Sequence, residues 1–412
     1  MSASRLEVRN ATNGGLVAEL ATFAATEVRQ AVERARDVQA AWGALSPAQR
    51  ARPMRRLAAT LRRRADDIAE RIRVETAKPF TEAIAEVLVS VDLVRFYLRT
   101  APGHLRARRA RGSWLITKAA WVEREPYGVV GVITGWNYPF ILPMDSVTPG
   151  LFAGNAVVLK PSELTSWTAA LIPELCAEAG LPQGLVQVVT GDGGTGRVLV
   201  GAGVDRIVFT GSTATGRKVM AAAAESLTPV TLELGGKDAA IVLADTDLER
   251  AARGVVFGSL FNAGQTCISI ERVFVERPVS EAFVERLALL VGSLGAGVDV
   301  GPLVSAAQAD IVERQVEDAV SRGARVLVGG RRVEPGSRLF LPTLLVDVDG
   351  TMEVAREETF GPVVAVTSVG DESDAIRQAN ESSYGLFASV WTGDRRRGQR
   401  VARRLEVGGV SV

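Results

Sequence analysis

The sequence predicts an α/β protein with two domains, each built on a doubly wound parallel sheet. Its 412 residues, 47% of them hydrophobic and 23% charged, can bury a large core and exceed the length of one ordinary domain. Short runs rich in Val and Ile alternate with helix-length segments, which is typical of parallel strands covered on both faces by helices. The alternation resumes after Leu234-Gly235-Gly236, so the boundary is expected near Glu233, with domains at 1–232 and 233–412.

Each element is expected from its local pattern. Between Thr26 and about Thr100, apolar residues recur every three and four positions with Arg and Glu between them, which predicts a layer of amphipathic helices. A polar, β-prone stretch follows at 112–122. Eight later runs are predicted to be buried strands because Val, Ile and other strand-forming residues fill them. These runs are 129–134, 156–159, 185–190, 206–210, 239–242, 272–275, 324–328 and 363–366.

The composition argues against several classes of partner. A formal net charge of +1 leaves no block of charge for nucleic acid or a charged membrane surface, so the expected ligand is a small molecule. The charge-free stretch 126–144 holds three prolines and three glycines, and we interpret it as a buried strand and turn rather than a membrane span. The chain begins without an apolar run behind a basic flank, so we expect no secretory signal and a cytoplasmic location.

Two cysteines and one histidine limit the chemistry. They cannot form a disulfide framework or a Cys/His zinc set, so no metal is expected. Cys267 is the better nucleophile, because Gly264 and small polar neighbours allow a turn that exposes a thiol, whereas Cys176 lies in an apolar helical stretch. Without further context, however, a single cysteine is more often an inert core residue than a catalyst.

Two other residues have the chemistry that a thioester intermediate needs. Asn137 follows a buried strand, where its amide could hold a developing oxyanion, although Asn before Pro139 is also a common turn residue. Glu233 lies in the apolar segment 230–236, where burial of an unpaired carboxylate would be costly. A raised pKa suited to a general base and a buried ion pair are both solutions, and the pattern leaves them open.

Two glycine-rich turns are candidates for binding a dinucleotide phosphate. The turn 191–196 follows a strand and matches the GxGxxG spacing. The turn 209–216 also follows a strand and opens a helix, and its Ser and Thr hydroxyls suit a pyrophosphate. Spacing does not choose between them.

Six longer motifs follow one another along the chain: Gly-Trp-Asn-Tyr-Pro at 135–139, Gly-Asn-Ala-Val-Val-Leu-Lys-Pro-Ser-Glu at 154–163, Phe-Thr-Gly-Ser-Thr at 209–213, Leu-Glu-Leu-Gly-Gly-Lys at 232–237, Gly-Gln-Thr-Cys at 264–267 and Glu-Glu-Thr-Phe-Gly-Pro at 357–362. In this order they resemble the aldehyde dehydrogenase superfamily. Six motifs in register are far more specific than any one, and the resemblance extends from Asn10 to the last residue.

The resemblance implies two Rossmann-like domains and NAD(P)-dependent oxidation of an aldehyde to a carboxylic acid. Cys267 would form the thiohemiacetal and thioester, Glu233 would be the general base, and Asn137 with the Cys267 backbone N–H would form the oxyanion hole. A reactive thiolate needs a lowered pKa, for which the bound nicotinamide cation is an expected cause. The implied cofactor residues favour the 209–216 turn over the other one: Trp136, Lys160, Glu163, Gly211, Ser212, Thr213, Gly216, Glu358 and Phe360.

The same resemblance narrows cofactor and substrate. A carboxylate at Glu163 would accept hydrogen bonds from ribose but repel a 2′-phosphate, so NAD is expected, with NADP as the alternative. Asp145 would repel an aldehyde that carries a carboxylate, so the expected substrate is an uncharged aliphatic or aromatic aldehyde. The implied base, Glu233, argues against a relative that passes its acyl group to coenzyme A.

A homo-oligomer and an oligomerisation arm at about 110–125 are also implied. The chain ends at Val412, where members of the superfamily continue with a substrate-side loop and a strand that joins a partner subunit. The alternative hypothesis is therefore a truncated, catalytically impaired homologue that binds dinucleotide or only folds, in which oligomerisation is doubtful. The presence of Cys267, Glu233 and Asn137 favours the enzyme.

Overall fold

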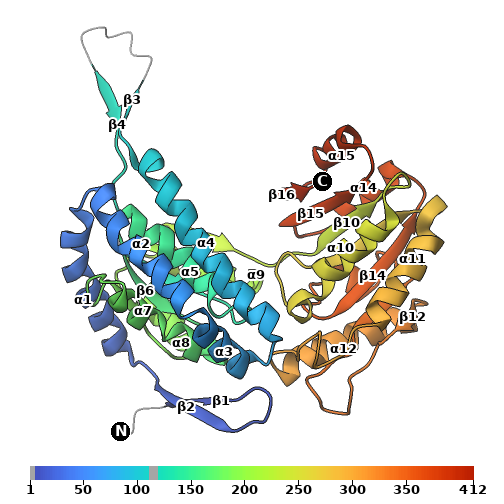
Figure 1. The fold of residues 1–412 in the computed structure, drawn as a ribbon, viewed down its shortest axis with the longest axis horizontal. Coiled ribbons are helices and arrows are strands. Elements are labelled where there is room, and N and C mark those ends of the chain that lie inside the picture. The colour runs from blue at the N-terminus through green and yellow to red at the C-terminus, as the bar shows by residue number, and fades with distance from the viewer. Residues whose placement is uncertain (1–4, 111–118) are drawn as a thin grey trace. The chain divides into compact units, whose positions relative to one another are not determined.

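The computed structural model describes residues 5–110 and 119–412, and the chain divides into two compact units, Met1–Glu233 and Leu234–Val412. Each unit contains its own mainly parallel sheet (Figure 1), so the predicted α/β class is confirmed. The arm predicted at about 110–125 lies partly outside the described residues. On either side of that gap, β3 (Arg108–Ala110) and β4 (Ala120–Val122) pair as antiparallel strands.

The predicted helical layer is confirmed as four helices within 25–105. Ser46 begins the second of them, because its side chain accepts a hydrogen bond from Gln49 N and Pro47 occupies the first turn. A residue in the left-handed region, Ala77, ends the third. An unpredicted antiparallel hairpin precedes the layer. The elements are β1 (Arg5–Arg9), β2 (Leu16–Ala21), α1 (Ala25–Gly43), α2 (Pro47–Arg63), α3 (Ala65–Thr76) and α4 (Phe80–Leu105).

The larger sheet of the first unit has the order β7-β6-β5-β8-β9, with every described pair parallel. The chain passes from β5 to β6 and β7, and then places β8 on the other side of β5. Such a reversal opens a crevice at the carboxyl ends of the strands, where α/β proteins bind ligands. All four strands predicted in this region are confirmed, and β9 was not predicted. The strands are β5 (Val129–Ile133), β6 (Ala156–Lys160), β7 (Val186–Val188), β8 (Arg206–Thr210) and β9 (Val230–Glu233).

Helices cover this sheet in layers. Helix α5 packs against β5 and β6 and contacts α2 and α4, whereas α1 and α8 pack against each other and the same strands. The charge-free stretch 126–144 forms β5, a turn and the start of α5, and no helix in the described ranges is long and apolar enough to cross a membrane. The remaining helices are α5 (Ile141–Ala153), η1 (Glu163–Thr165), α6 (Ser166–Ala169), α7 (Ile172–Glu178), α8 (Gly193–Val200) and α9 (Thr213–Ala224).

The second unit is built on a sheet of order β12-β13-β14-β11-β10-β15-β16. Its four predicted strands are present, but the expectation of a parallel strand at 324–328 is wrong, because β12 pairs antiparallel with β13 at the sheet edge. Three strands in this unit, β13, β15 and β16, were not predicted. The strands are β10 (Asp238–Val242), β11 (Ile270–Glu276), β12 (Arg325–Val328), β13 (Thr343–Val346), β14 (Val363–Val369), β15 (Phe387–Trp391) and β16 (Gly409–Ser411).

The helices of the second unit bury the apolar faces of its central strands. Side chains of β10, β11 and β14 form separate hydrophobic clusters with residues of these helices on either face, as expected for a covered parallel sheet. The helices are α10 (Leu248–Leu260), η2 (Phe261–Gly264), α11 (Arg277–Gly292), α12 (Ala306–Ser321), α13 (Glu353–Arg356), α14 (Glu372–Asn380) and α15 (Arg395–Ala402).

Candidate active site

A pocket of about 520 Å³ lies at the carboxyl ends of β5, β6 and β8 in the first unit. This is the crevice that the reversal of strand order predicts. Two of the predicted cofactor residues, Thr213 and Gly216, lie in the first turn of α9 without being part of the pocket lining. Five others line the pocket: Trp136, Lys160, Glu163, Gly211 and Ser212.

Both glycine-rich turns reach this pocket, and their helix caps distinguish them. At the start of α8, the Asp192 carboxylate accepts hydrogen bonds from Gly194 N at 2.8 Å and Thr195 N at 3.4 Å. At the start of α9, the neutral hydroxyl of Ser212 accepts from Thr215 N at 3.3 Å. A helix N-terminus attracts anions, but α8 already has a carboxylate there. The start of α9 is therefore the better seat for a phosphate.

Two basic side chains that the sequence analysis missed also line the pocket. Arg197 and Lys218 line it from α8 and α9. Lys160 Nζ lies 3.1 Å from Glu163 Oε2, with the lysine side chain 5% and the carboxylate 43% exposed. Helical spacing could have identified Lys218 from the sequence, because it lies three positions after Thr215 and so falls on the same face of the helix.

Asn137 lies in the turn between β5 and α5 and is buried, with 9% of its surface exposed. A Cβ added to Gly135 would come within 3.3 Å of Asn137 Oδ1, so the absence of a side chain there leaves room for the amide. Burial in a short turn after a central strand restricts where this amide can point.

The environment expected for Glu233 is wrong. The residue ends the edge strand β9, its side chain is exposed, and it forms no ion pair with any described residue. Its carbonyl accepts a hydrogen bond from Gly211 N at 3.0 Å, which ties the end of β9 to the turn before α9. Apolar neighbours in sequence predicted burial, but an edge strand leaves its last residue open to solvent.

In the second unit, Cys267 follows a tight turn that brings two motifs together. Asn262 and Ala263 have φ values of 56° and 55°, and Gly264 has a φ of +69°. A Cβ on Gly264 would lie 2.0 Å from the carbonyl oxygen of Gly361, so the backbones touch. The turn that precedes the nucleophile candidate thereby contacts the segment 357–362.

A third motif joins them. Gly236 N donates to Glu358 Oε1 at 3.1 Å, and a Cβ on Gly236 would lie 2.5 Å from the carbonyl oxygen of Cys267. Segments near positions 236, 267 and 358 therefore meet, and the structure brings Cys267 and Glu358 into one region of the second unit.

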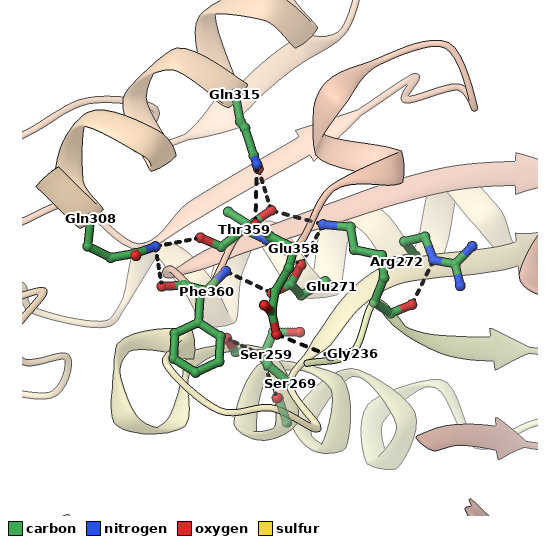
Figure 2. Close-up of polar contacts among 12 residues, drawn as sticks. Gly236, Ser259, Ser269, Glu271, Arg272, Gln308, Gln315, Glu358, Thr359 and Phe360 are labelled. Carbon is green, nitrogen blue, oxygen red and sulfur yellow. Dashed lines mark hydrogen bonds and ion pairs between the residues drawn. The ribbon is translucent and has the colours of Figure 1, made fainter. Parts of the chain in front are cut away.

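A buried polar network fixes the segment of Glu358 and Phe360 (Figure 2). Glu271 on β11 accepts hydrogen bonds from the backbone N–H groups of Thr359 and Phe360, both at 2.8 Å. Lys237 Nζ donates to Glu271 at 2.5 Å and to Thr359 Oγ1 at 2.9 Å. Phe360 has a φ of +50°, an unfavourable conformation for an aromatic residue, which these contacts help to hold. The sequence analysis missed Glu271 and gave Lys237 no role of its own.

The surroundings of the two cysteines set their reactivity. The pKa of Cys267 is raised to about 11, mainly by burial and in addition by the charges of Asp238 and Glu358. Burial likewise raises the pKa of Asp238 to about 8 and that of Glu358 to about 7. Without a bound cation, Cys267 is a protonated thiol at neutral pH. Cys176 is buried in α7 with its pKa raised to about 12 by desolvation, which confirms its helical, apolar setting.

The raised pKa of Cys267 predicts how fast the thiol is alkylated. In the protein alone, the second-order rate of iodoacetamide reaction should rise about tenfold per pH unit between pH 7 and 10, because thiolate is the minor form throughout. Glu358→Gln should increase the rate near pH 8 by removing a negative charge. Mass spectrometry of the Cys267 peptide would measure this rate. A rate that levels off below pH 8 would contradict the raised pKa of Cys267.

Comparison with known proteins agrees with this arrangement. The family model described as the aldehyde dehydrogenase family matches residues 1–412. The chain is 41% identical over 392 residues to a 4,4′-diapolycopene aldehyde oxidase of Methylomonas sp., covering 93% of this chain and 73% of the relative.

Solved structures give the same result. A putative aldehyde dehydrogenase from Burkholderia cenocepacia superposes with a TM-score of 0.94 at 38% identity, covering 99% of this chain and 88% of that one. An NADP-dependent enzyme of E. coli gives 0.95 at 34% identity, covering 99% and 86%. A betaine aldehyde dehydrogenase from Staphylococcus aureus in complex with NAD+ gives 0.93 at 30% identity, covering 99% and 83%. With its motifs, fold and site geometry in agreement, the chain belongs to the aldehyde dehydrogenase family.

Proposed function

We propose that this protein oxidises an aldehyde to a carboxylic acid with NAD(P)+, using Cys267 as nucleophile. The observation that supports it best is the junction in the second unit where Gly236, Cys267 and Glu358 meet. A cysteine held by close backbone contacts, rather than packed in a core, is what a nucleophile requires and an inert thiol does not.

The pocket of the first unit suits a dinucleotide. Lys160 and Glu163 offer a cation and a carboxylate for ribose hydroxyls, and the start of α9 with Lys218 offers N–H groups and positive charge for phosphates. When bound, a nicotinamide dinucleotide would supply the hydride acceptor for the oxidation. Glu358 and Phe360, held by the Glu271 network, are proposed to seat the nicotinamide ribose and ring.

The residues of the chain would perform the other steps. The Cys267 thiol loses its proton to solvent, the thiolate sulfur bonds to the aldehyde carbon, and the carbonyl π electrons move to oxygen to form an oxyanion, which Asn137 and the Cys267 N–H stabilise. After the carbon has lost its hydride, the carbonyl reforms as a thioester. Glu233 removes a proton from water, which adds to the thioester, and the C–S bond breaks to release the acid and the thiol. An exposed Glu233 is accessible to that water.

Apolar side chains support an uncharged, hydrophobic substrate. Ile268, next to Cys267, is 46% exposed, and Phe257 is 66% exposed, with its ring centre 5.1 Å from that of Phe261. In the first unit, Asp145 on α5 is exposed and would repel a carboxylate. The relative from Methylomonas sp. is, by its name, an oxidase of 4,4′-diapolycopene aldehyde. We propose uncharged aliphatic or aromatic aldehydes as the substrate class.

One assay panel tests this function. The purified protein is given apolar aldehydes and a short semialdehyde with a carboxylate, each with NAD+ or NADP+, and NADH or NADPH and the acid product are measured. We expect kcat/KM for apolar aldehydes to be at least about tenfold higher than kcat/KM for the semialdehyde. A tenfold ratio corresponds to a difference of about 1.4 kcal/mol in activation free energy. NAD+ is expected to be preferred through Glu163. Preference for NADP+ would show that Arg197 or Lys218 outweighs that carboxylate, and no acid from any aldehyde would refute the proposal.

A further inference from the structure

A buried ion pair contacts the turn that contains Asn137. Lys78, in the connection between α3 and α4, and Glu86, on α4, lie 2.5 Å apart between Nζ and Oε1. Their side chains are only 5% and 2% exposed. Neither residue belongs to the motifs that suggested the site, and both come from elements more than 50 positions before the turn.

The pair contacts both ends of the turn. Lys78 Nζ donates to the carbonyl oxygen of Asn137 at 3.0 Å and lies 4.7 Å from the centre of the Tyr138 ring. Glu86 Oε2 accepts hydrogen bonds from Phe140 N at 3.2 Å and Ile141 N at 3.3 Å. One cation and one carboxylate therefore hold the backbone on either side of Pro139, which has no N–H of its own.

Glu86 also caps a helix from outside. Helix α5 begins at Ile141, and its N-cap residue, Phe140, has no side-chain cap of its own. The first N–H groups of a helix have no partner inside it, and a carboxylate there is favoured by the helix dipole. Glu86 therefore fixes where α5 starts, while Lys78 fixes the carbonyl of the residue three positions before Phe140.

Stability alone is a weak reason for such a pair. Removing two charges from water costs as much as their attraction returns, and apolar residues of similar volume often stabilise a fold equally well. A buried ion pair does, however, specify one position for the groups it bonds. An amide that stabilises an oxyanion must be positioned closely, and a misplacement of about 1 Å can slow a reaction about 10²-fold.

We propose that Lys78 and Glu86 are positioning residues for Asn137, holding its turn so that the amide meets the oxyanion of the Cys267 adduct. The inference rests on the proposed function, because it takes Asn137 to be the oxyanion donor. It predicts that the pair affects the rate of hydride transfer rather than the binding of aldehyde or dinucleotide.

Single-turnover formation of NADH tests the inference in the full chain. Lys78→Met, Glu86→Gln and the double variant Lys78→Met/Glu86→Leu, in which apolar groups replace both charges, are compared with Asn137→Ala. We expect the first three to slow hydride transfer by about 10- to 100-fold, with KM for aldehyde and Kd for NAD+ changed less than about threefold. Glu86→Gln, nearly isosteric, provides a folded variant if another fails to fold.

A matched control separates positioning from stability. Glu75 is also buried, and its carboxylate accepts two backbone hydrogen bonds, from Trp167 N at 2.7 Å and Thr168 N at 2.9 Å, but it does not touch the turn. Glu75→Gln should lower the melting temperature by an amount similar to Glu86→Gln while leaving the hydride-transfer rate within about twofold of the parent.

A double-mutant comparison distinguishes the possible failures. If Lys78 acts through Asn137, adding Lys78→Met to Asn137→Ala should slow the reaction less than about threefold further. If the fold-changes of Lys78→Met and Asn137→Ala multiply in the double variant, the positioning role is overturned. The same holds if the ion-pair variants keep the parental rate while Asn137→Ala is slow. Neither result would affect the proposed function. A parental rate in Asn137→Ala would instead show that the oxyanion assignment, on which the inference rests, is wrong.

Discussion

Replacement of Cys267 by serine is expected to abolish aldehyde-dependent NADH formation, with a fall in kcat on the order of 10³-fold or more. A serine hydroxyl has no easily formed anion, and the charge of Glu358, which helps to raise the pKa of the Cys267 thiol, would oppose an alkoxide as well. Dinucleotide binding, measured by calorimetry, should be unchanged, because Cys267 is not among the residues that line the pocket of the first unit.

Cys176→Ser is the matched control for this substitution. The same atomic change is made at a thiol buried in α7, where no step of the proposed reaction takes place. Its kcat should remain within about twofold of the parent, even if burial of a hydroxyl lowers the melting temperature slightly. Full activity in Cys267→Ser would show that Cys267 is not the nucleophile.

Glu233→Gln is expected to give the second large effect, a fall in steady-state turnover of about 10²-fold with the first burst of NADH retained. Hydride transfer precedes thioester hydrolysis, so loss of the base should stop the enzyme at the acyl intermediate. Rapid-mixing fluorescence would measure the burst, and mass spectrometry of the quenched protein would detect acylated Cys267.

A second exposed carboxylate in the same unit provides the control. Glu225 follows α9, and Glu225→Gln makes the same change of charge. It should keep both burst and steady-state rate. Disappearance of the burst in Glu233→Gln, with steady-state turnover intact, would mean that this carboxylate does not activate water.

Local pattern was sufficient to predict the α/β class, the helical layer and most central strands. Val129–Ile133 and Arg206–Thr210 could be identified because both runs are rich in the β-branched residues that are typical of parallel strands. Edge strands gave less signal. β16 is only three residues long and contains one Val. β12 has three exposed residues, so the sequence did not show which strand it pairs with or that this pairing is antiparallel.

The sequence by itself determined the chemical groups of this protein: a cysteine close after a glycine, an Asn after a strand, and two glycine-rich turns that follow strands. Only the tertiary structure decided their environments. The exposure of Glu233 depends on its place at a sheet edge, and the raised pKa of Cys267 depends on burial and on Asp238 and Glu358, which are distant in sequence. The bonds from Lys78 and Glu86 to the Asn137 turn arise from packing of α4 near α5. Burial and electrostatics are sums over spatial neighbours, and periodicity along the chain does not contain them.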